Sequence, residues 1–376
     1  MRFLTRELAQ TIVQRTMEIL KTNINVMDRN GVIIGSGDLK RIGTVHLGAV
    51  EAIQKGVCIE ITEDQARDLP GTKSGINQPF KFQGEIVGVI GITGDPEKVR
   101  QYAQLVQMTA ELILEQSVLI EQLRWDERLR ENFVLRLINS EANFDPLFFE
   151  QAKMLKIDLD LPRVAIVIVN HEQQEIFHII KDFIDPDDLY TITFQYVVVF
   201  KQIYKRNDTW DYQKIKEQMV KLKDWARDMF SIKLQMGLGR YHPGIDGFYQ
   251  SFQEAKNTLE VGLKIHPEKN VYFYNDYHLD VFLMQASSVT KISDLVKPYQ
   301  KLRKYEKQGE LTKTLETFIQ EGQNMNQVAE KLYIHRNTIY YRFDVIKELT
   351  GKDPRNTQDL LDLYISMKLY QISSRE

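Results

Sequence analysis

One short stretch near the C-terminus concentrates side chains that can contact DNA bases. It runs Ile334-His335-Arg336-Asn337-Thr338-Ile339-Tyr340-Tyr341-Arg342 and is too polar for a core segment. Arginine pairs with guanine and asparagine with adenine in the major groove, while histidine, threonine and tyrosine suit phosphate or mixed contacts. The stretch therefore predicts DNA binding through His335, Arg336, Asn337, Thr338, Tyr340, Tyr341 and Arg342.

The residues around this stretch have the pattern of a helix-turn-helix. A compact motif of this kind needs a small residue where the two helices cross and apolar residues that join them. Ala329 is the small residue. The apolar positions are Val328, Leu332, Ile334 and Ile339. The second helix repeats apolar residues on one face until Gly351 ends it, so its polar residues turn outward.

The low net charge of the motif and the residue in its turn leave an alternative to DNA binding open. Tyr333 departs from the familiar pattern, because glycine often occupies the turn. Residues 324–350 carry four basic and three acidic side chains, a net charge of +1, within a chain of net charge −3. Affinity for DNA must therefore come from dimerisation and placement and not from bulk charge. The alternative is a solvated helical hairpin in which the arginine and asparagine act only as caps.

A loop near the N-terminus contains residues that suit a carboxylate ligand. It runs Gly35-Ser36-Gly37-Asp38-Leu39-Lys40-Arg41-Ile42-Gly43-Thr44-Val45-His46 and leads into a helix. Arg41 can bind a carboxylate through two parallel hydrogen bonds, and the glycines let backbone N–H groups approach it. Thr44 is expected as the N-cap, which would direct the start of the helix and His46 toward an anion.

A second loop, Lys73-Ser74-Gly75-Ile76-Asn77-Gln78-Pro79, can supply a cation and an amide from across the same pocket. Two such loops in one small domain suit a molecule with a carboxylate and several hydroxyls. The expected ligand contacts are Ser36, Gly37, Arg41, Ile42, Gly43, His46, Lys73, Ser74, Gly75 and Asn77. Simpler explanations exist, because the glycines could serve only a turn, Arg41 could pair with Asp38, and His46 could lie on a helix surface.

The composition is that of a globular protein. The chain has 376 residues, of which 43% are hydrophobic and 27% are charged, and at roughly one domain per 150 residues it should form two or three domains. Its longest uncharged apolar runs, 86–93 and 196–200, are far shorter than the roughly 20 residues of a membrane span. Because the N-terminus carries no secretion signal, we expect the protein in the cytoplasm.

The sequence indicates no metal site and no cofactor. Cys58 is the only cysteine, which excludes an internal disulfide and a multi-cysteine zinc site. We expect it to be a small buried hydrophobe. The segment His171-Glu172-Gln173-Gln174-Glu175 has a glutamate where a zinc protease needs its second histidine.

The elements that must position the N-terminal loops alternate between helix and strand. Helices are predicted over 6–21 and 45–54, two strands around an Arg-Asn-Gly turn over 25–34, and further strands over 57–61, 78–82 and 85–93. This succession fits a small α/β sensor fold of the PAS or Cache kind better than a Rossmann domain.

A long helix is predicted from Pro96 to about Asn139. Apolar residues recur there at intervals of three, four or seven, and the helix would be on the order of 60 Å long. We expect it to connect two domains and to pair with its copy in a dimer. The alternative is a helix broken into two buried pieces.

A second α/β segment follows from about residue 141. Strands are predicted over 164–169, 189–194, 196–201 and 232–237, with helices near 173–184, 211–229 and 247–264. A helical region from about 290 to the C-terminus contains the helix-turn-helix. Together the segments predict an α+β multidomain protein.

Residues at both ends of the chain resemble a known family. Tyr333-Ile334-His335-Arg336-Asn337-Thr338, with Tyr341-Arg342 and Ile346-Lys347-Glu348-Leu349-Thr350-Gly351, resembles the C-terminal DNA-binding domain of the purine-catabolism-regulator type. The sugar-diacid recognition domain is resembled by Asn23-Ile24-Asn25-Val26-Met27-Asp28, Gly35-Ser36-Gly37-Asp38, Arg41-Ile42-Gly43 and the segment 84–94. Over nearly its whole length the chain resembles the carbohydrate diacid regulator family of bacterial transcription factors.

The resemblance implies a ligand-responsive transcription regulator, expected to be an activator. It implies a sensor domain over 1–140 that includes the long helix from about 96, a degenerate nucleotide-cyclase-like α/β domain over 141–285, and an all-α helix-turn-helix domain over 286–376. The implied partners are double-stranded operator DNA, an effector such as glucarate, galactarate or glycerate, and further copies of the chain in a homodimer or higher homo-oligomer. No membrane contact is implied.

An enzyme is the main alternative function. A diguanylate cyclase needs a Gly-Gly-acidic turn for its nucleotide and magnesium, and the corresponding hairpin, Thr193-Phe194-Gln195-Tyr196, has neither feature. We therefore expect the middle domain to serve dimerisation and transmission. An enzyme that acts on small hydroxy acids could use Arg41, His46 and Asp38, but no nucleophile, metal or cofactor motif supports turnover, so we expect no enzyme. A protein-interaction scaffold is a third alternative.

Overall fold

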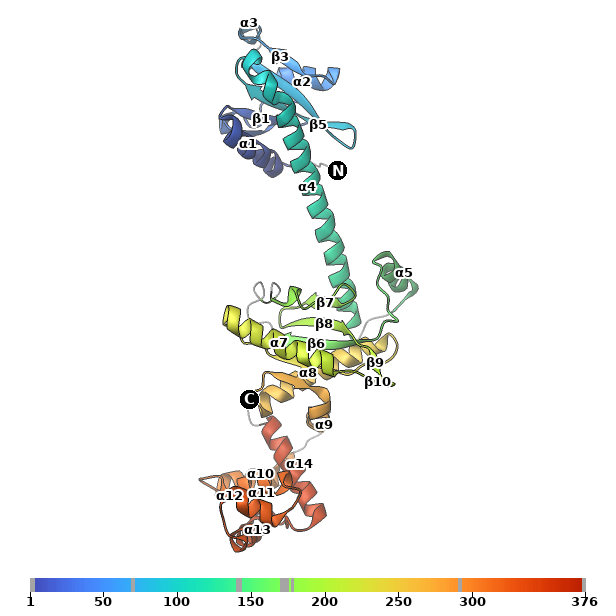
Figure 1. The fold of residues 1–376 in the computed structure, drawn as a ribbon, viewed down its shortest axis with the longest axis vertical. Coiled ribbons are helices and arrows are strands. Elements are labelled where there is room, and N and C mark those ends of the chain that lie inside the picture. Colours follow the sequence, from blue (N-terminus) through green and yellow to red (C-terminus); the bar gives the residue numbers. More distant parts are fainter. Residues whose placement is uncertain are drawn as a thin grey trace. The chain divides into compact units, whose positions relative to one another are not determined.

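The structure is a computed structural model that describes residues 4–68, 72–139, 144–169, 176, 179–289 and 293–373. The chain divides into two compact units, Met1–Arg128 and Leu129–Glu376. Figure 1 shows the elements of each unit along the chain. The mixed α+β architecture expected from the sequence is confirmed.

The first unit contains a five-stranded antiparallel sheet in the order β2-β1-β5-β4-β3. The strands are β1 (Ile24–Met27), β2 (Ile33–Ser36), β3 (Ile59–Ile61), β4 (Gly75–Phe82) and β5 (Glu85–Thr93). Gln83 and Gly84 both have positive φ and form the tight turn between β4 and β5, as the predicted hairpin requires. The sheet order places β1, β5 and β4 at the centre.

Helices cover the two faces of this sheet. On one face, α1 (Arg6–Leu20) contributes Ala9, Ile12 and Val13 to a core that includes Ile90 of β5. On the other face, α2 (Leu47–Lys55) packs two alanines against Met27, Ile33 and Val89. Two short elements, η1 (Leu39–Arg41) and α3 (Glu63–Arg67), lie in the connections. The loops that carry the predicted ligand residues are thus held at the edges of a packed sheet.

The long segment after β5 is one continuous helix, α4 (Pro96–Leu137), and not two pieces. Its first half buries Val99, Ala103, Val106, Ala110, Ile113 and Leu114 against the first sheet. Its last turns bury Phe133, Val134 and Leu137 in the second unit. Residues 119–128 between these two contacts are all exposed.

The second unit begins with another five-stranded sheet in the order β12-β11-β6-β8-β7. Its strands are β6 (Arg163–Val169), β7 (Leu189–Ile192), β8 (Tyr196–Gln202), β11 (Met236–Leu238) and β12 (Val271–Phe273). Only β11 and β12 pair in parallel. A small hairpin of β9 (Lys205–Arg206) and β10 (Thr209–Trp210) follows β8.

Helices again cover both faces of the second sheet. The face that carries Ala165 and Val167 packs against α5 (Pro146–Met154), α8 (Asp246–Ile265) and the end of α4. The opposite face packs against α7 (Gln213–Phe230). Of the helix predicted at 173–184, residues 176 and 179–184 are described, and among them 176 and 179–181 are helical. The segment 171–175 lies outside the described residues.

The rest of the second unit is helical. The helices are α9 (Tyr274–Val289), α10 (Ser293–Tyr305), α11 (Glu310–Gln320), α12 (Met325–Leu332), α13 (Arg336–Thr350) and α14 (Thr357–Ser373). The predicted apolar contacts of the helix-turn-helix are present, since Val328 and Ile339 are buried and Leu332 and Ile334 are half-buried in one core. Within the described residues, no helix is long and apolar enough to span a bilayer.

Two local expectations were wrong. Cys58 is exposed and not buried. Thr44 is not the N-cap of α2, because the helix begins at Leu47 with His46 as its cap residue. The Thr44 hydroxyl instead donates to the carbonyl oxygen of Arg41 at 2.7 Å, a short-range bond that holds the loop before the helix.

Candidate functional sites

A small pocket in the first unit brings six of the predicted ligand residues together. It is lined by Asn25, Arg41, His46, Lys73, Ser74, Gly75, Ile76, Asn77, Gly91, Ile92 and Thr93. The six predicted residues are Arg41, His46, Lys73, Ser74, Gly75 and Asn77. The cavity volume is about 10 Å³, which is roughly the space of one water.

His46 contributes a neutral imidazole to this pocket. Its backbone N–H donates to the carbonyl oxygen of Gly31 at 2.9 Å, and its side chain is 5% exposed. Burial, with a smaller effect from the positive charge of Arg41, lowers the pKa of His46 to about 4. Its Nδ1 atom has no hydrogen-bond partner among the described residues.

Asn77 contributes a second buried polar group without a partner. It lies on β4 and is 2% exposed, and its Oδ1 atom accepts no hydrogen bond from the described residues. Gly48 of α2 lets the helix approach, because a Cβ there would lie 2.7 Å from Asn77 Nδ2. Leaving a buried polar atom unpaired costs about 1–3 kcal/mol, so two in one pocket need an explanation.

Two cations from different segments lie beside these groups. Arg41 is half-buried in η1, and Lys73 is exposed just before β4. Gly75 lies two residues after Lys73 and begins β4. A Cβ at this position would lie 2.1 Å from the carbonyl oxygen of Ile92, so only glycine fits there. The pocket therefore combines positive charge with neutral hydrogen-bonding groups, which is the chemistry that a hydroxylated carboxylate requires.

Four predicted ligand residues do not line the pocket: Ser36, Gly37, Ile42 and Gly43. The Ser36 hydroxyl donates to Asn25 Oδ1 at 2.6 Å. The Gly37 N–H donates to the carbonyl oxygen of Ile24 at 3.1 Å. Asp38, which the enzyme alternative used, accepts a hydrogen bond from the N–H of Lys40 and caps η1.

Sequence reasoning missed five lining residues, of which two have polar side chains, Asn25 and Thr93. The other three are Ile76, Gly91 and Ile92. Asn25 left a signal, because it is a polar residue within the otherwise apolar strand Ile24–Met27 and is 2% exposed. A buried polar side chain in a central strand usually serves a network or a ligand. Thr93 ends β5 and left no comparable signal.

The helix-turn-helix presents part of the predicted DNA-binding set to solvent. Arg336, Asn337, Tyr340 and Tyr341 are exposed on α13, while Thr338 is half-buried. His335 is the N-cap, and its Nδ1 atom accepts from the N–H of Asn337 at 3.2 Å. Ile339, Phe343 and Ile346 on the opposite face are fully buried. The exposed face is therefore free of core packing.

Arg342 is held within the protein. Its Nη1 atom donates to the Thr314 hydroxyl at 3.0 Å, and its Nη2 atom lies 3.2 Å from Glu310 Oε2. Both partners belong to α11, and the side chain is 15% exposed. Arg342 thus joins the second helix of the motif to the helix that precedes it.

An ion-pair network holds the C-terminal end of α13. The Arg355 guanidinium lies 2.7 Å from Asp344 and 2.8 Å from Asp353. Lys347 lies 3.2 Å from Asp353. The hydrogen bonds from Arg355 hold the pKa of Asp353 well below its usual range. This network ties α13 to the loop that follows it.

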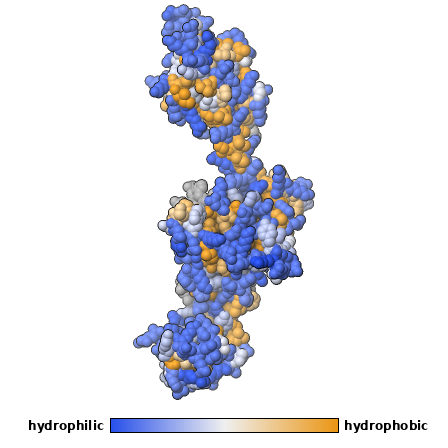
Figure 2. All heavy atoms as spheres, in the orientation of Figure 1, coloured by the Kyte–Doolittle hydropathy of each residue, from blue (hydrophilic) through white to orange (hydrophobic). Residues whose placement is uncertain are grey.

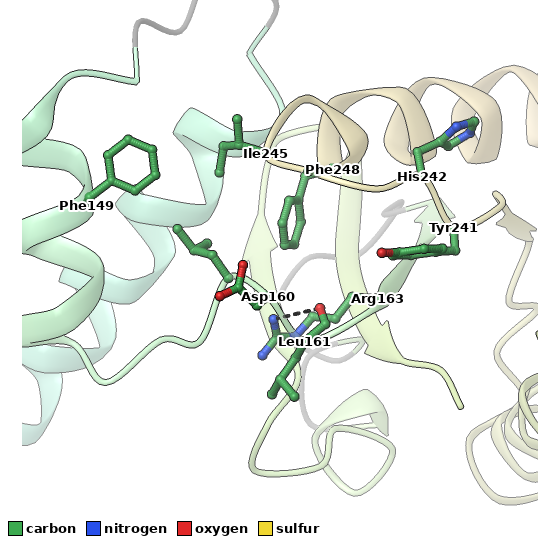
Figure 3. Close-up of a pocket in the computed structure, with 10 residues that line it drawn as sticks. Phe149, Asp160, Leu161, Arg163, Tyr241, His242, Ile245 and Phe248 are labelled. Carbon is green, nitrogen blue, oxygen red and sulfur yellow. Dashed lines mark hydrogen bonds between the residues drawn. The ribbon is translucent and has the colours of Figure 1, made fainter. Parts of the chain in front are cut away.

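The middle region contains a larger cavity of about 340 Å³ (Figure 3). Phe149, Tyr241 and Phe248 form much of its wall, and Arg163 lies at its lower edge in this view. The Arg163 guanidinium donates to the carbonyl oxygens of Asp158 and Asp187. This buried arginine therefore already serves the fold by tying two loops together.

The hairpin between β7 and β8 has no metal-binding character. Thr193 and Tyr196 bond to each other, and Phe194 is 85% exposed. Within the described ranges, no group of three or more histidine, cysteine, aspartate or glutamate side chains could hold a metal ion.

Comparisons with known families match three consecutive parts of the chain. Residues 4–137 match the sugar diacid recognition family, and residues 140–261 match the GGDEF-like domain family. Residues 311–369 match the family of PucR C-terminal helix-turn-helix domains.

Relatives cover nearly the whole chain. The carbohydrate diacid regulator of Escherichia coli (strain K12) is 37% identical over 377 residues, with 97% of this chain and 98% of the relative covered. An uncharacterised protein of Haemophilus influenzae is 34% identical, with 96% and 98% covered. A third relative, the uncharacterised protein YsfB of Bacillus subtilis, is 26% identical, with 97% and 98% covered.

Proposed function

This chain belongs to the carbohydrate diacid regulator family, whose members are transcription regulators and not enzymes, and on that premise we propose that it responds to a small hydroxylated carboxylic acid. The acid would be a sugar diacid such as glucarate or galactarate, or a glycerate-like acid. It would bind in the pocket of the first unit and alter how α13 engages operator DNA.

The observation that carries this proposal is the pair of unpartnered buried atoms, His46 Nδ1 and Asn77 Oδ1. Both residues line the pocket that Arg41 and Lys73 also border. A polyhydroxy acid matches this set, because its carboxylate suits the two cations and its hydroxyls can bond to the neutral imidazole and the amide. A molecule with only carboxylates would leave Asn77 Oδ1 unsatisfied, because this oxygen accepts hydrogen bonds and a carboxylate has none to donate.

A thermal-shift experiment tests the proposal. Glycerate, glucarate and galactarate are added separately to the wild-type protein and to the variant Arg41→Ala. We expect one of the acids to raise the melting temperature of the wild type and to leave Arg41→Ala unchanged, because the variant lacks the bidentate donor.

Lys40→Ala is the matched control. Lys40 is the neighbouring exposed cation and does not line the pocket, so this variant should keep the full ligand shift. An undiminished shift in Arg41→Ala would place the ligand elsewhere. No shift with any acid in the wild type would contradict the proposed effector class.

We propose that α13 enters the major groove, where Arg336 and Asn337 contact base edges. Their exposure at the start of α13 supports this role. His335, Thr338, Tyr340 and Tyr341 would then lie near phosphates. Arg342 would act by holding α13 against α11, since both of its contacts are internal.

We propose that the protein is a homodimer that pairs through α4. One face of this helix exposes apolar residues at intervals of three, four or seven, as in a helix-pairing stripe. They are Leu105, Met108, Leu112, Leu119 and Leu123. Figure 2 shows hydrophobic residues on the visible surface of this helix. A stripe on one copy would match the same stripe on a second copy.

The remaining assignments are also proposals. The strand order β2-β1-β5-β4-β3 supports a PAS or Cache type of sensor fold. The family matches support a sensor domain over 1–140, a degenerate cyclase-like domain over 141–285 and a DNA-binding domain over 286–376. As a regulator of bacterial genes, the protein would act in the cytoplasm as an activator.

A further inference from the structure

The turn of the helix-turn-helix holds an aromatic residue in a left-handed conformation. Tyr333 ends α12 with φ 56° and ψ 41°. A Cβ makes this conformation unfavourable, which is why glycine commonly occupies it. Among the described residues other than glycine with positive φ, Tyr333 is the only aromatic one. The sequence thus keeps an unfavourable residue at this turn.

The side chain of Tyr333 does not pack against the rest of the motif. The Tyr333 side chain is 94% exposed, and its hydroxyl has no hydrogen-bond partner within the described part of the chain. The residues on either side do contribute, because Leu332 and Ile334 are half-buried against the core of the motif. An unfavourable backbone conformation that no packing or hydrogen bond within the protein offsets points to a functional contact.

The position of Tyr333 relative to α13 suggests which contact this is. Only two residues separate it from Arg336, so their Cα atoms are at most about 10 Å apart. When the start of α13 lies in the major groove, which is about 12 Å wide, a residue just before the helix lies at the edge, where phosphates are. The neighbouring cation, Lys331, is paired with Glu321 at 2.6 Å.

We propose that the Tyr333 hydroxyl donates a hydrogen bond to a DNA phosphate at the edge of the groove, and that this contact accounts for a tyrosine where the backbone favours glycine. The inference rests on the proposed entry of α13 into the major groove. It adds a contact outside α13 to the predicted DNA-binding set.

The test compares Tyr333→Phe and Tyr333→Gly in the full-length protein, using a duplex that the wild type has enriched from a random pool. Tyr333→Phe should leave the melting temperature unchanged and weaken DNA binding about tenfold, because only the hydroxyl is lost. Tyr333→Gly should weaken binding at least as much while raising the melting temperature. The salt dependence of binding should stay the same, since no charge is removed.

Two further variants serve as controls. Ser231 has a similar conformation, with φ 57° and ψ 25° at the end of α7, so Ser231→Gly should raise the melting temperature without changing DNA affinity. Arg336→Ala should weaken binding through its base contact.

Wild-type affinity in Tyr333→Phe would overturn the proposed phosphate contact. A lowered melting temperature in Tyr333→Gly would show that the residue serves the fold and would also overturn it. If Arg336→Ala binds normally, the proposed placement of α13 fails, which is a separate outcome from a failure at Tyr333.

Discussion

At the scale of single residues, His46 links the chemistry of the small pocket that it lines to the stability of the first unit. Its imidazole is buried beside Arg41, and its pKa is lowered to about 4. It is therefore neutral at physiological pH and offers a hydrogen bond without a charge. This suits a ligand hydroxyl better than a second carboxylate.

The same lowered pKa predicts how stability depends on pH. The folded-state value of about 4 lies below the unfolded value of 6.5, so the unfolded state binds more protons between these pH values. The contribution of His46 to the free energy of unfolding is fully present above pH 6.5. It falls by up to about 3 kcal/mol as the pH drops toward 4. His46→Gln should flatten this part of the profile, as measured by amide exchange of β4 and β5 at several pH values.

The wild type and His46→Gln must be compared directly, because carboxylates elsewhere also titrate in this range. The difference between the two profiles isolates His46. Identical profiles from pH 4 to 6.5 would show that His46 is not held neutral by burial.

Residue type and loop position were enough to find half of the pocket. Arg41, Lys73 and Asn77 could be predicted because charge and amide chemistry are visible in the sequence. Ser36 and Gly37, which were also predicted to contact the ligand, do not line the pocket, and their partners in the fold are distant in sequence. Ser36 bonds to Asn25, and a Cβ at Gly37 would lie 2.4 Å from the sulfur of Met17. Such packing partners cannot be deduced from local spacing.

At the scale of elements, strongly periodic segments were predictable and short buried ones were not. The hairpin of β4 and β5 and the full length of α4 follow from apolar periodicity and a Gln-Gly turn. β12 was missed because Val271–Phe273 is only three residues long and runs directly into α9 with no turn between them. Its partner in the parallel pair, β11, lies more than thirty residues earlier.

The exposed face of α4 gives the prediction at this scale. Leu119 and Leu123 are 56% and 59% exposed, so replacing both by glutamate should leave the fold intact. If two copies pair through this face, Leu119→Glu with Leu123→Glu should convert the dimer to a monomer, because like charges would meet at the seam. Light scattering on the purified protein measures the change in mass.

Glu121→Lys is the control for this double variant. Glu121 is exposed and lies two residues after Leu119, which places it on the opposite side of α4. Reversing its charge should therefore not alter the mass of the assembly. An unchanged mass in the double variant would place the dimer contact on another element.

At the scale of the whole molecule, sensing and DNA binding reside in different parts of one chain. The sugar diacid recognition match ends at residue 137, and the helix-turn-helix match begins at residue 311. If the two sites are coupled, the coupling must be reciprocal, because it is one free energy shared by both equilibria.

This reciprocity can be measured. We expect the effective acid to change the affinity for operator DNA by about 5–150-fold, and DNA to change the affinity for the acid by the same factor. Fluorescence anisotropy with labelled duplex gives the first ratio, and calorimetric titration of acid into the free protein and the complex gives the second. An acid that binds the first unit without altering DNA affinity would exclude regulation through this pocket.

The lone cysteine offers a way to follow such a signal. Cys58 is exposed and directly precedes β3, whose Ile59 lies opposite Asn77 of β4. Partial burial and the Glu60 carboxylate raise the pKa of the thiol, so alkylation by a fluorophore should proceed best in mildly alkaline buffer. With no competing thiol in the sequence, a single dye would sit next to the strand that carries Asn77 and register its movement in real time.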